Sequence, residues 1–287
     1  MAIRIITDTS ADFTPEQAAA ANITVVPLPV TIGNTTYDTI DKSLFYDKLI
    51  NGADFPKTSQ PSPQVLCDIF EDAKEAGDAV IAIMLSSGLS GTYQCACLAK
   101  ELADYSEIYV VDSLSATVAI QILALEAAKL RDNGAAAPEI AAALDELKGR
   151  ITIYAVMDTL EYLYKGGRLS RSQAQIGNLA NLKPVITVTA EGTIKVTDKC
   201  IGLGMGSKAV LKKLKQVSLD PAYPAHLLYA YDPANCLTFR EKLLTQFPDL
   251  ELTEPFNIGP VIGTHIGPNA LGIVIVKAQE AMEEFLS

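Results

Sequence analysis

Residues 79–92 read Ala79-Val80-Ile81-Ala82-Ile83-Met84-Leu85-Ser86-Ser87-Gly88-Leu89-Ser90-Gly91-Thr92. The first seven are apolar, as in a strand that is buried on both faces of a parallel sheet. The next seven combine glycine with hydroxyl side chains, and helical spacing then continues to about residue 103. A buried strand that leads through such a loop into a helix is typical of α/β folds, whose ligands bind beyond the carboxyl ends of the strands.

Strand-like and helix-like segments alternate on both sides of this stretch. Strands are predicted at residues 3–7, 23–30 and 108–111, and helices begin near Thr14-Pro15, Ser43 and Ser62-Pro63. Further helical spacing extends to Gly149. This alternation predicts an N-terminal α/β domain, residues 1–149, with a doubly wound, mostly parallel sheet in three layers.

The pattern changes after residue 149. Strands are predicted at residues 151–156, 185–189, 193–197, 225–231, 251–256 and 271–276, and helices at 158–164, 207–217 and 234–246. Glu191-Gly192 is a hairpin signal, and Gly202-x-Gly204-x-Gly206 predicts a mobile turn before a helix. We expect a smaller C-terminal α/β domain, residues 150–287, with a mixed sheet in two layers.

Composition limits the class of protein. The chain has 287 residues, 49% apolar and 20% charged, which suits a sizeable folded core. Its net charge of −11 disfavours nucleic acid and allows at most transient membrane contact. Five cysteines, an odd number, indicate reduced thiols, and no apolar run approaches the ~20 residues of a membrane span. We therefore expect a cytoplasmic protein, and with two histidines we expect no metal site.

The loop Ser86–Thr92 is the strongest candidate site. The start of a helix offers free backbone N–H groups and a positive dipole end, and the hydroxyl groups add further donors for an anion. A phosphate loop of the Walker type would need a lysine that is absent here, and the Gly-x-Ser-x-Gly elbow of a hydrolase fails at Thr92. An ordinary strand–helix turn with capping serines is the alternative.

Other segments are weaker candidates. Thr58-Ser59-Gln60-Pro61-Ser62 is a second hydroxyl-rich loop before a helix, and Arg168 follows Gly166-Gly167 in an exposed-looking loop. His265 lies in a predicted loop before the last strand. Asp8-Thr9-Ser10 and Asp112-Ser113 each follow a strand, where they line the same crevice or cap the next helix.

Several of these segments together resemble the DegV family, which includes the fatty-acid-binding subunits of bacterial fatty acid kinase. The matching pieces span nearly the whole chain in the family's order: Ile6-Thr7-Asp8-Thr9-Ser10, Thr58-Ser59-Gln60-Pro61-Ser62, Ser86-Ser87-Gly88-Leu89-Ser90-Gly91-Thr92-Tyr93, Val111-Asp112-Ser113, Asp158-Thr159-Leu160-Glu161-Tyr162-Leu163, Lys165-Gly166-Gly167-Arg168-Leu169-Ser170 and His265-Ile266-Gly267-Pro268. Each piece alone is a weak signal, but the set is specific.

The resemblance implies a two-domain protein that holds a long-chain fatty acid between its domains and has no cofactor. The family's carboxylate contacts fall on Thr58 and Ser90, with Ser59, Gly91 and Thr92 beside them. Arg168 and His265 match the residues tied to the carboxylate end and to engaging the kinase. By this resemblance the chain is a carrier and not itself an enzyme, and a separate ATP-dependent kinase phosphorylates the bound carboxylate.

One segment departs from the family's pattern. Many members have a basic, arginine-containing segment before the helix around Lys208, whereas this chain reads Cys200-Ile201-Gly202-Leu203-Gly204-Met205-Gly206-Ser207. Two other functions remain open at this point. One is a small hydrolase that uses Ser90, for which His265 is the one candidate base and has no acidic neighbour in sequence to orient it. The other is a module that binds a phosphate-bearing ligand.

Overall fold

The computed structural model describes residues 2–174 and 181–279. Contacts between residues divide the chain into two compact units. Unit 1 comprises Met1–Thr39, Thr58–Gly149 and Ala190–Thr193, and unit 2 comprises Ile40–Lys57, Arg150–Thr189 and Ile194–Ser287. Two short segments thus group apart from their neighbours in sequence: 40–57 joins unit 2, and the turn 190–193 joins unit 1.

Unit 1 is built on a parallel sheet of four strands. Their order is β2 (Ile23–Val26), β1 (Ile3–Asp8), β6 (Ala79–Met84) and β7 (Ile108–Asp112). Every pair of neighbours runs parallel, with Ile5 opposite Ile81 and Ile83 opposite Val111. All six residues of β6 are buried, because the strand is central and both faces of the sheet are covered.

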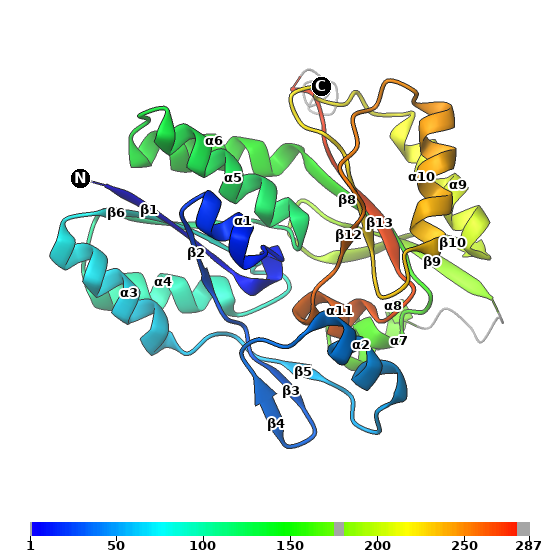
Figure 1. The fold of residues 1–287 in the computed structure, drawn as a ribbon, viewed down its shortest axis with the longest axis horizontal. Helices are drawn as coiled ribbons and strands as arrows, with labels where there is room; N and C mark the ends of the chain where they lie inside the picture. Colours follow the sequence, from blue (N-terminus) through cyan, green and yellow to red (C-terminus); the bar gives the residue numbers. More distant parts are fainter. Residues whose placement is uncertain (1, 175–180, 280–287) are drawn as a thin grey trace. The chain divides into compact units, whose positions relative to one another are not determined.

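Helices cover both faces of this sheet. Helices α3 (Pro63–Ala76) and α4 (Thr92–Ala103) pack Phe70 and Ala99 against Val80 and Met84 on one face. Helix α5 (Val118–Asp132) packs against β1 and β6, and Figure 1 shows it with α1 (Pro15–Ala20) and α6 (Ala137–Arg150) on the opposite side from α3 and α4. The predicted three-layer, doubly wound parallel domain is therefore confirmed.

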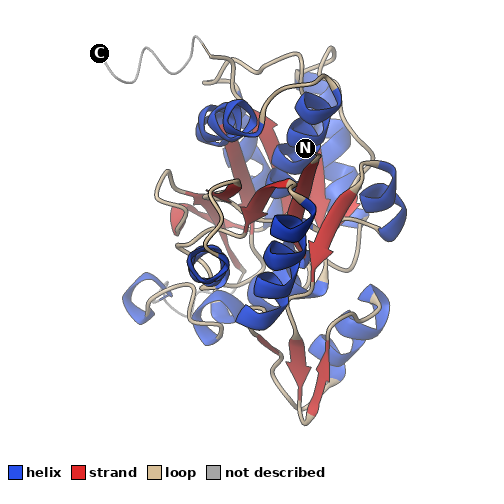
Figure 2. Cartoon of the chain, turned by 90° about the vertical axis from the view of Figure 1, so that its left-hand side faces the viewer, coloured by secondary structure: helices blue, strands red, loops and turns tan. Residues whose placement is uncertain are grey.

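Residues 23–30 do not form the single strand that the sequence pattern predicts. Strand β2 ends at Val26, and β3 (Val30–Ile32) pairs with β4 (Thr35–Tyr37) in a separate sheet of order β4-β3-β5, where β5 is Lys57–Thr58. The prediction was wrong because Pro27 and Pro29 have no N–H to donate to a ladder. Figure 2 shows the β3–β4 hairpin as two adjacent arrows at the lower edge of the view.

Unit 2 contains a mixed sheet of six strands. Their order is β10 (Ile194–Ile201), β9 (Leu182–Val188), β8 (Ile151–Val156), β13 (Leu271–Val276), β11 (His226–Tyr229) and β12 (Phe256–Asn257). The β11–β12 pair is parallel and the other pairs are antiparallel. Helices α9 (Leu203–Leu214) and α10 (Ala234–Gln246) pack Leu211 and Phe239 against Leu227 and Ile273, so the mixed two-layer domain is confirmed.

The predictions for residues 251–256 and 202–206 of unit 2 were wrong. The predicted strand at residues 251–256 is reduced to the two residues of β12 and an isolated bridge between Ala225 and Leu252, because Pro255 interrupts the segment. The predicted turn at residues 202–206 belongs largely to α9, which begins at Leu203. A Cβ on Gly206 would lie 2.4 Å from Val156 Cγ1, so glycine here allows the helix to approach the sheet closely.

The described part of unit 2 also contains four shorter helices. They are α2 (Lys42–Asn51), α7 (Glu161–Lys165), α8 (Arg171–Ala174) and α11 (Pro260–Ile266). Asp41 caps α2 by accepting a hydrogen bond from Leu44 N, and Tyr46 Oη donates to Ile258 O at 3.0 Å. His265 was predicted in a loop but lies in the last turn of α11, because Pro260 starts a helix after Gly259.

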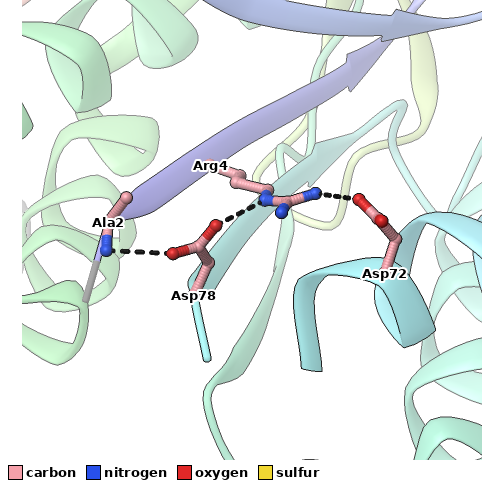
Figure 3. Close-up of polar contacts among 4 residues, drawn as sticks. All are labelled: Ala2, Arg4, Asp72 and Asp78. Carbon is pink, nitrogen blue, oxygen red and sulfur yellow. Dashed lines mark hydrogen bonds and ion pairs between the residues drawn. The ribbon is translucent and has the colours of Figure 1, made fainter. Parts of the chain in front are cut away.

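An ion-pair cluster ties the start of β1 to the end of α3 in unit 1 (Figure 3). Arg4 contacts Asp72 at 2.5 Å and Asp78 at 2.9 Å, and Asp78 also accepts a hydrogen bond from Ala2 N. These pairings hold the pKa of Asp78 below its usual value. None of the helices in the described part of the chain is long and apolar enough to cross a membrane.

Candidate functional site

The loop Ser86–Gly91 connects β6 to α4 at the carboxyl edge of the parallel sheet. The amides of Leu89 and Ser90 both donate to Ser86 O at 3.0 Å, which curls the loop toward the helix. Ser90 Oγ lies 2.8 Å from Thr92 Oγ1 and also accepts from Thr92 N at 3.3 Å. Ser90, Gly91 and Thr92 therefore gather at the start of α4, where backbone N–H groups lack partners within the helix.

The loop Thr58–Ser62 lies beside this helix start. Ser59 N donates to Pro29 O at 3.0 Å, and Cys95 Sγ of α4 contacts Pro61 O at 3.6 Å. A Cβ on Gly91 would lie 2.1 Å from Gln60 Oε1. The structure thus brings together the two hydroxyl-rich loops that the sequence singled out, and both belong to unit 1.

A buried carboxylate helps to hold the first loop in place. Asp8 is fully buried, and it accepts hydrogen bonds from Leu85 N at 2.8 Å and Ser10 N at 2.9 Å. Burial raises the pKa of Asp8, and the hydrogen bonds from Ser10 and Leu85 oppose that rise. The capping alternative for the Asp8 motif is confirmed, because this carboxylate caps the short helix η1 (Thr9–Ala11), and it also reaches the end of the neighbouring strand β6.

Asp112 plays the corresponding part at the end of β7. It accepts hydrogen bonds from Ser87 N and Leu114 N, each at 3.1 Å. The ends of three neighbouring strands are thereby joined at the sheet edge from which the loop starts. These contacts orient backbone rather than offer a charge to a ligand, since both carboxylates already accept hydrogen bonds from the protein.

Arg168 and His265 come together in unit 2. Arg168 Nη1 donates to Gly166 O at 2.6 Å, and a Cβ on Gly166 would lie 2.1 Å from His265 Nδ1. Burial lowers the pKa of His265 to about 3, and the nearby Arg168 guanidinium adds to this effect. Burial also lowers the pKa of Arg168. At neutral pH this pair therefore presents one positive charge beside a neutral imidazole.

Sequence reasoning missed some residues at both places. Gln60 lies inside a motif that was recognised, yet no pattern indicated its contact with Gly91. In unit 2, a Cβ on Gly267 would lie 2.3 Å from the Tyr162 ring, whose centroid is 6.0 Å from that of Phe55. The His-Ile-Gly-Pro motif carries this packing, because Gly267 has φ of 72° and leaves room for the ring.

Within residues 2–174 and 181–279, no group of three or more His, Cys, Asp or Glu side chains could hold a metal ion. The Ser90 hydroxyl contacts the hydroxyl of Thr92 and accepts a hydrogen bond from the Thr92 amide. Such a hydroxyl is suited to hydrogen bonding with an anion.

The fold and these loops define the class of protein. It is an α/β protein of two units, and the unit with the parallel sheet carries uncharged, hydroxyl-rich loops at the start of a helix. The chain belongs to the DegV family, because the family model, described as an uncharacterised protein of the DegV family, matches residues 2–278. A DegV domain-containing protein of Caldanaerobacter subterraneus subsp. tengcongensis is 37% identical over 276 residues, which cover 94% of this chain and 97% of that protein.

Two solved structures are similar to this one over nearly the whole chain. A fatty-acid-binding DegV family protein from Thermus thermophilus has a TM-score of 0.85 and 29% identity, covering 97% of this chain and 100% of that chain. DegV of Bacillus subtilis, a fatty acid binding protein, has a TM-score of 0.84 and 31% identity with the same coverage.

Proposed function

We propose that this chain binds a long-chain fatty acid between its two domains and presents the carboxylate to a separate, ATP-dependent fatty acid kinase. In this proposal Thr58 and Ser90 are the main contacts of the carboxylate, with Ser59, Gly91 and Thr92 beside them. Arg168 and His265 would act at the carboxylate end and in engaging the kinase. The chain would be a cytoplasmic carrier of the acyl group and of its phosphate.

One observation carries the proposal: two hydroxyl-rich loops without a charged side chain converge at the start of α4. The approach of Gln60 to Gly91 and of Cys95 to Pro61 O brings the loops together. Hydroxyl groups and helix N–H groups can bind a carboxylate without a buried salt bridge, whose desolvation would be costly. The fatty-acid-binding relatives from Thermus thermophilus and Bacillus subtilis support the choice of ligand.

The energetics of an acyl tail are compatible with a weakly polar head-group site. Burying ~15 methylene groups at ~0.8 kcal/mol each gives a gross gain of about 12 kcal/mol. The net gain is smaller because the bound tail loses freedom. The tail would therefore provide most of the affinity, while the two loops orient the carboxylate and leave one oxygen available for phosphoryl transfer.

The kinase part of the proposal depends on unit 2. Arg168 supplies a positive charge that could meet the carboxylate or the transferring phosphate, and the neutral His265 lies next to it. Residues 200–207, the segment that departs from the pattern expected of the family, include two exposed apolar side chains, Ile201 and Met205. We expect any kinase that this chain serves to have a less acidic docking surface than one that meets arginines.

The test of binding starts with protein purified from its own host. Denaturation should release a fatty acid in near-stoichiometric amount, which mass spectrometry identifies. Palmitate or oleate should raise the melting temperature of protein from which the lipid has been stripped. Ser90→Ala and Thr58→Val should each weaken binding roughly 10-fold or more, since hydrogen bonds to a charged group are worth about 1.5–3 kcal/mol.

Matched controls are available for both substitutions. Thr31 lies on β3 of the same small sheet as Thr58 and bonds to the Thr36 hydroxyl on the surface, and Ser106 is an exposed serine that bonds to Glu107. Thr31→Val and Ser106→Ala should leave binding unchanged. Stripped wild-type protein that gains no stability from either fatty acid would exclude the proposal.

Presentation to the kinase is tested separately. The fatty-acid kinase component of the same host is added with ATP and Mg²⁺, and acyl phosphate is trapped as the hydroxamate with hydroxylamine. Arg168→Ala should lower this yield more than it lowers fatty acid affinity. Equal losses of both quantities would show that Arg168 acts in binding alone.

A further inference from the structure

The turn between β9 and β10 has an unusual place in the chain. Both strands belong to unit 2, but residues Ala190–Thr193 group with unit 1. Gly192 in this turn has φ of 73°, a left-handed conformation that favours glycine. The turn is therefore part of unit 1 by its contacts, while its two ends continue directly into strands of the other unit.

The Ser86 hydroxyl connects this turn to the loop at the start of α4. Ser86 is fully buried, and its Oγ donates to Gly192 O at 2.8 Å and accepts from Gly88 N at 3.2 Å. A hydroxyl has one proton to donate, so the bond to Gly192 uses its donor and the bond from Gly88 uses a lone pair. One side chain thus fixes the loop backbone against the turn.

The two segments approach too closely for side chains at the contact. A Cβ on Gly192 would lie 2.1 Å from Ser86 Oγ, and a Cβ on Gly88 would lie 2.7 Å from Gly192 O. The second of these contacts is with backbone, which cannot move aside as the end of a flexible side chain can. The separation of loop and turn is therefore set by backbone packing and by the Ser86 hydroxyl.

Ser86 also governs the part of the loop that carries the proposed ligand contacts. Its carbonyl accepts from Leu89 N and Ser90 N, and its hydroxyl holds Gly88 N. Three successive amides of the loop are thus fixed by one residue, and Ser90 is the last of them. Any shift of Ser86 relative to the turn must move the backbone from which the Ser90 hydroxyl projects.

We infer that Ser86 is a positioning residue for the carboxylate loop, and that the turn 190–193 is coupled to occupancy of this loop. The inference rests on the proposed function, since the occupant is the fatty acid carboxylate. Coupling between two sites is reciprocal. If the turn stabilises the loop that binds the carboxylate, the bound carboxylate stabilises the turn, and the effect passes along the chain to β9 and β10.

Hydrogen exchange measured by mass spectrometry tests this coupling. Exchange in peptides that cover residues 189–194 is compared in stripped protein with and without palmitate, alongside the palmitate affinity of each variant. In wild-type protein, palmitate should slow exchange of the turn amides by about 5-fold or more. Ser86→Ala should weaken palmitate about 5- to 10-fold, the effect of one hydrogen bond, and should abolish the slowing.

The control for Ser86→Ala removes a similar bond elsewhere in the same hairpin. Thr187 of β9 donates from its hydroxyl to Ile153 O, also at 2.8 Å. Thr187→Val should lower the melting temperature to a similar degree but keep both palmitate affinity and the slowed exchange. A second pair of variants separates the effect of backbone strain from that of a steric clash. Gly192 and Gly134 both have positive φ, so alanine is strained at either position. The Cβ of Gly192→Ala would clash with Ser86, whereas that of Gly134→Ala has no atom within 4 Å.

The outcomes are distinct. Palmitate binding without slowed exchange at the turn, or equal losses of affinity in Ser86→Ala and Thr187→Val, would overturn this inference and leave the proposed function standing. Gly192→Ala should weaken palmitate while Gly134→Ala should not, and equal effects would also count against it. Wild-type protein that binds no fatty acid would overturn the proposed function and this inference with it.

Discussion

The amide oxygen of Gln60 lies against Gly91, at a place where a Cβ on Gly91 would come within 2.1 Å of Gln60 Oε1. This contact joins the loop after β5 to the first residue before α4. Gln60 is exposed, so its side chain can move aside if a methyl group is added. The close approach therefore concerns the geometry of the proposed carboxylate site more than the stability of the fold.

The first prediction follows from this contact. Gly91→Ala should weaken palmitate binding several-fold, because the methyl group displaces Gln60 and covers backbone that the carboxylate would approach. The free energy of unfolding should fall by about 1 kcal/mol or less, since Gly91 has φ of −75° and alanine is only a poorer cap than glycine. Fluorescent fatty acid displacement and urea unfolding measure the two quantities.

A double variant separates the two causes. Gly91→Ala combined with Gln60→Ala removes the clash and should recover part of the lost affinity. An affinity that is the same in the single and double variants would mean that the clash with Gln60 has no bearing on binding.

The second prediction concerns two adjacent glycines in unit 2. Gly166→Ala would place a Cβ 2.1 Å from His265 Nδ1 and 3.1 Å from Tyr162 O, although its φ of −74° suits any residue. Gly167 has φ of 75° but nothing within 4 Å of its Cβ position. Overpacking should cost Gly166→Ala about 1–3 kcal/mol of stability and displace His265. Backbone strain alone should cost Gly167→Ala about 1 kcal/mol.

The readout that distinguishes these glycines is the kinase assay. Gly166→Ala should lower the yield of acyl phosphate, because Arg168 and His265 both contact residue 166. Gly167→Ala should keep that yield at temperatures where it remains folded. If the two variants lose activity in proportion to their stability, the arrangement around Gly166 has a structural role only.

The third prediction is a dependence of stability on pH. Burial, helped by Arg168, lowers the pKa of His265 to about 3 in the folded protein, whereas an unfolded chain has a value near 6.5. Between these values the unfolded chain binds a proton that the folded chain does not, so stability falls as pH decreases below about 6.5. The slope from one such group is at most about 1.4 kcal/mol per pH unit.

The contribution of His265 is isolated by comparing His265→Gln with the wild-type protein. His226 has a pKa lowered to about 4 by burial and acts in the same direction, while the buried Asp8, whose pKa is raised, acts in the opposite one. Both remain in the variant and cancel in the difference. As pH falls from 7 to 5, the unfolding free energy of the wild-type protein should decrease more than that of the variant. A difference independent of pH would contradict the low pKa.

Much of the fold could be predicted because local and tertiary signals agree. Strand β13 and helix α10 occupy the residues that the pattern gave, 271–276 and 234–246. The helix start predicted near Thr14-Pro15 is confirmed, and Thr14 there forms a capping box with Gln17, with both of its hydrogen bonds. In each of these segments, hydrophobic periodicity and boundary residues favour the same structure.

The errors arise where one residue overrides the hydrophobic pattern. Pro27 and Pro29 divide residues 23–30 between two sheets, and Pro260 starts the helix that contains His265. Glycines at residues 202–206 indicate a turn by propensity, but packing of Gly206 on Val156 favours a helix. The meeting of the two loops could not be predicted from the residues alone, because it depends on contacts between residues far apart in the sequence, such as Gln60 and Gly91.

The last prediction concerns the ion pair of Arg150 and Asp220 in unit 2. Arg150 Nη1 lies 2.7 Å from Asp220 Oδ2 and 3.2 Å from Lys277 O, and 10% of the Arg150 side chain is exposed. Asp220→Ala removes a charged hydrogen-bond partner of this mostly buried cation and should cost about 1.5–3 kcal/mol of unfolding free energy in urea at pH 7. Asp145→Ala, which breaks an exposed i,i+3 pair with Lys148, should cost less than about 1 kcal/mol. The hydrogen bond from Ala222 N and the Arg150 pairing lower the pKa of Asp220, so the stabilisation from both contacts should be lost as pH falls below the ordinary value of 3.8. If Asp220→Ala and Asp145→Ala lower the unfolding free energy equally at pH 7, burial does not strengthen the ion pair of Arg150.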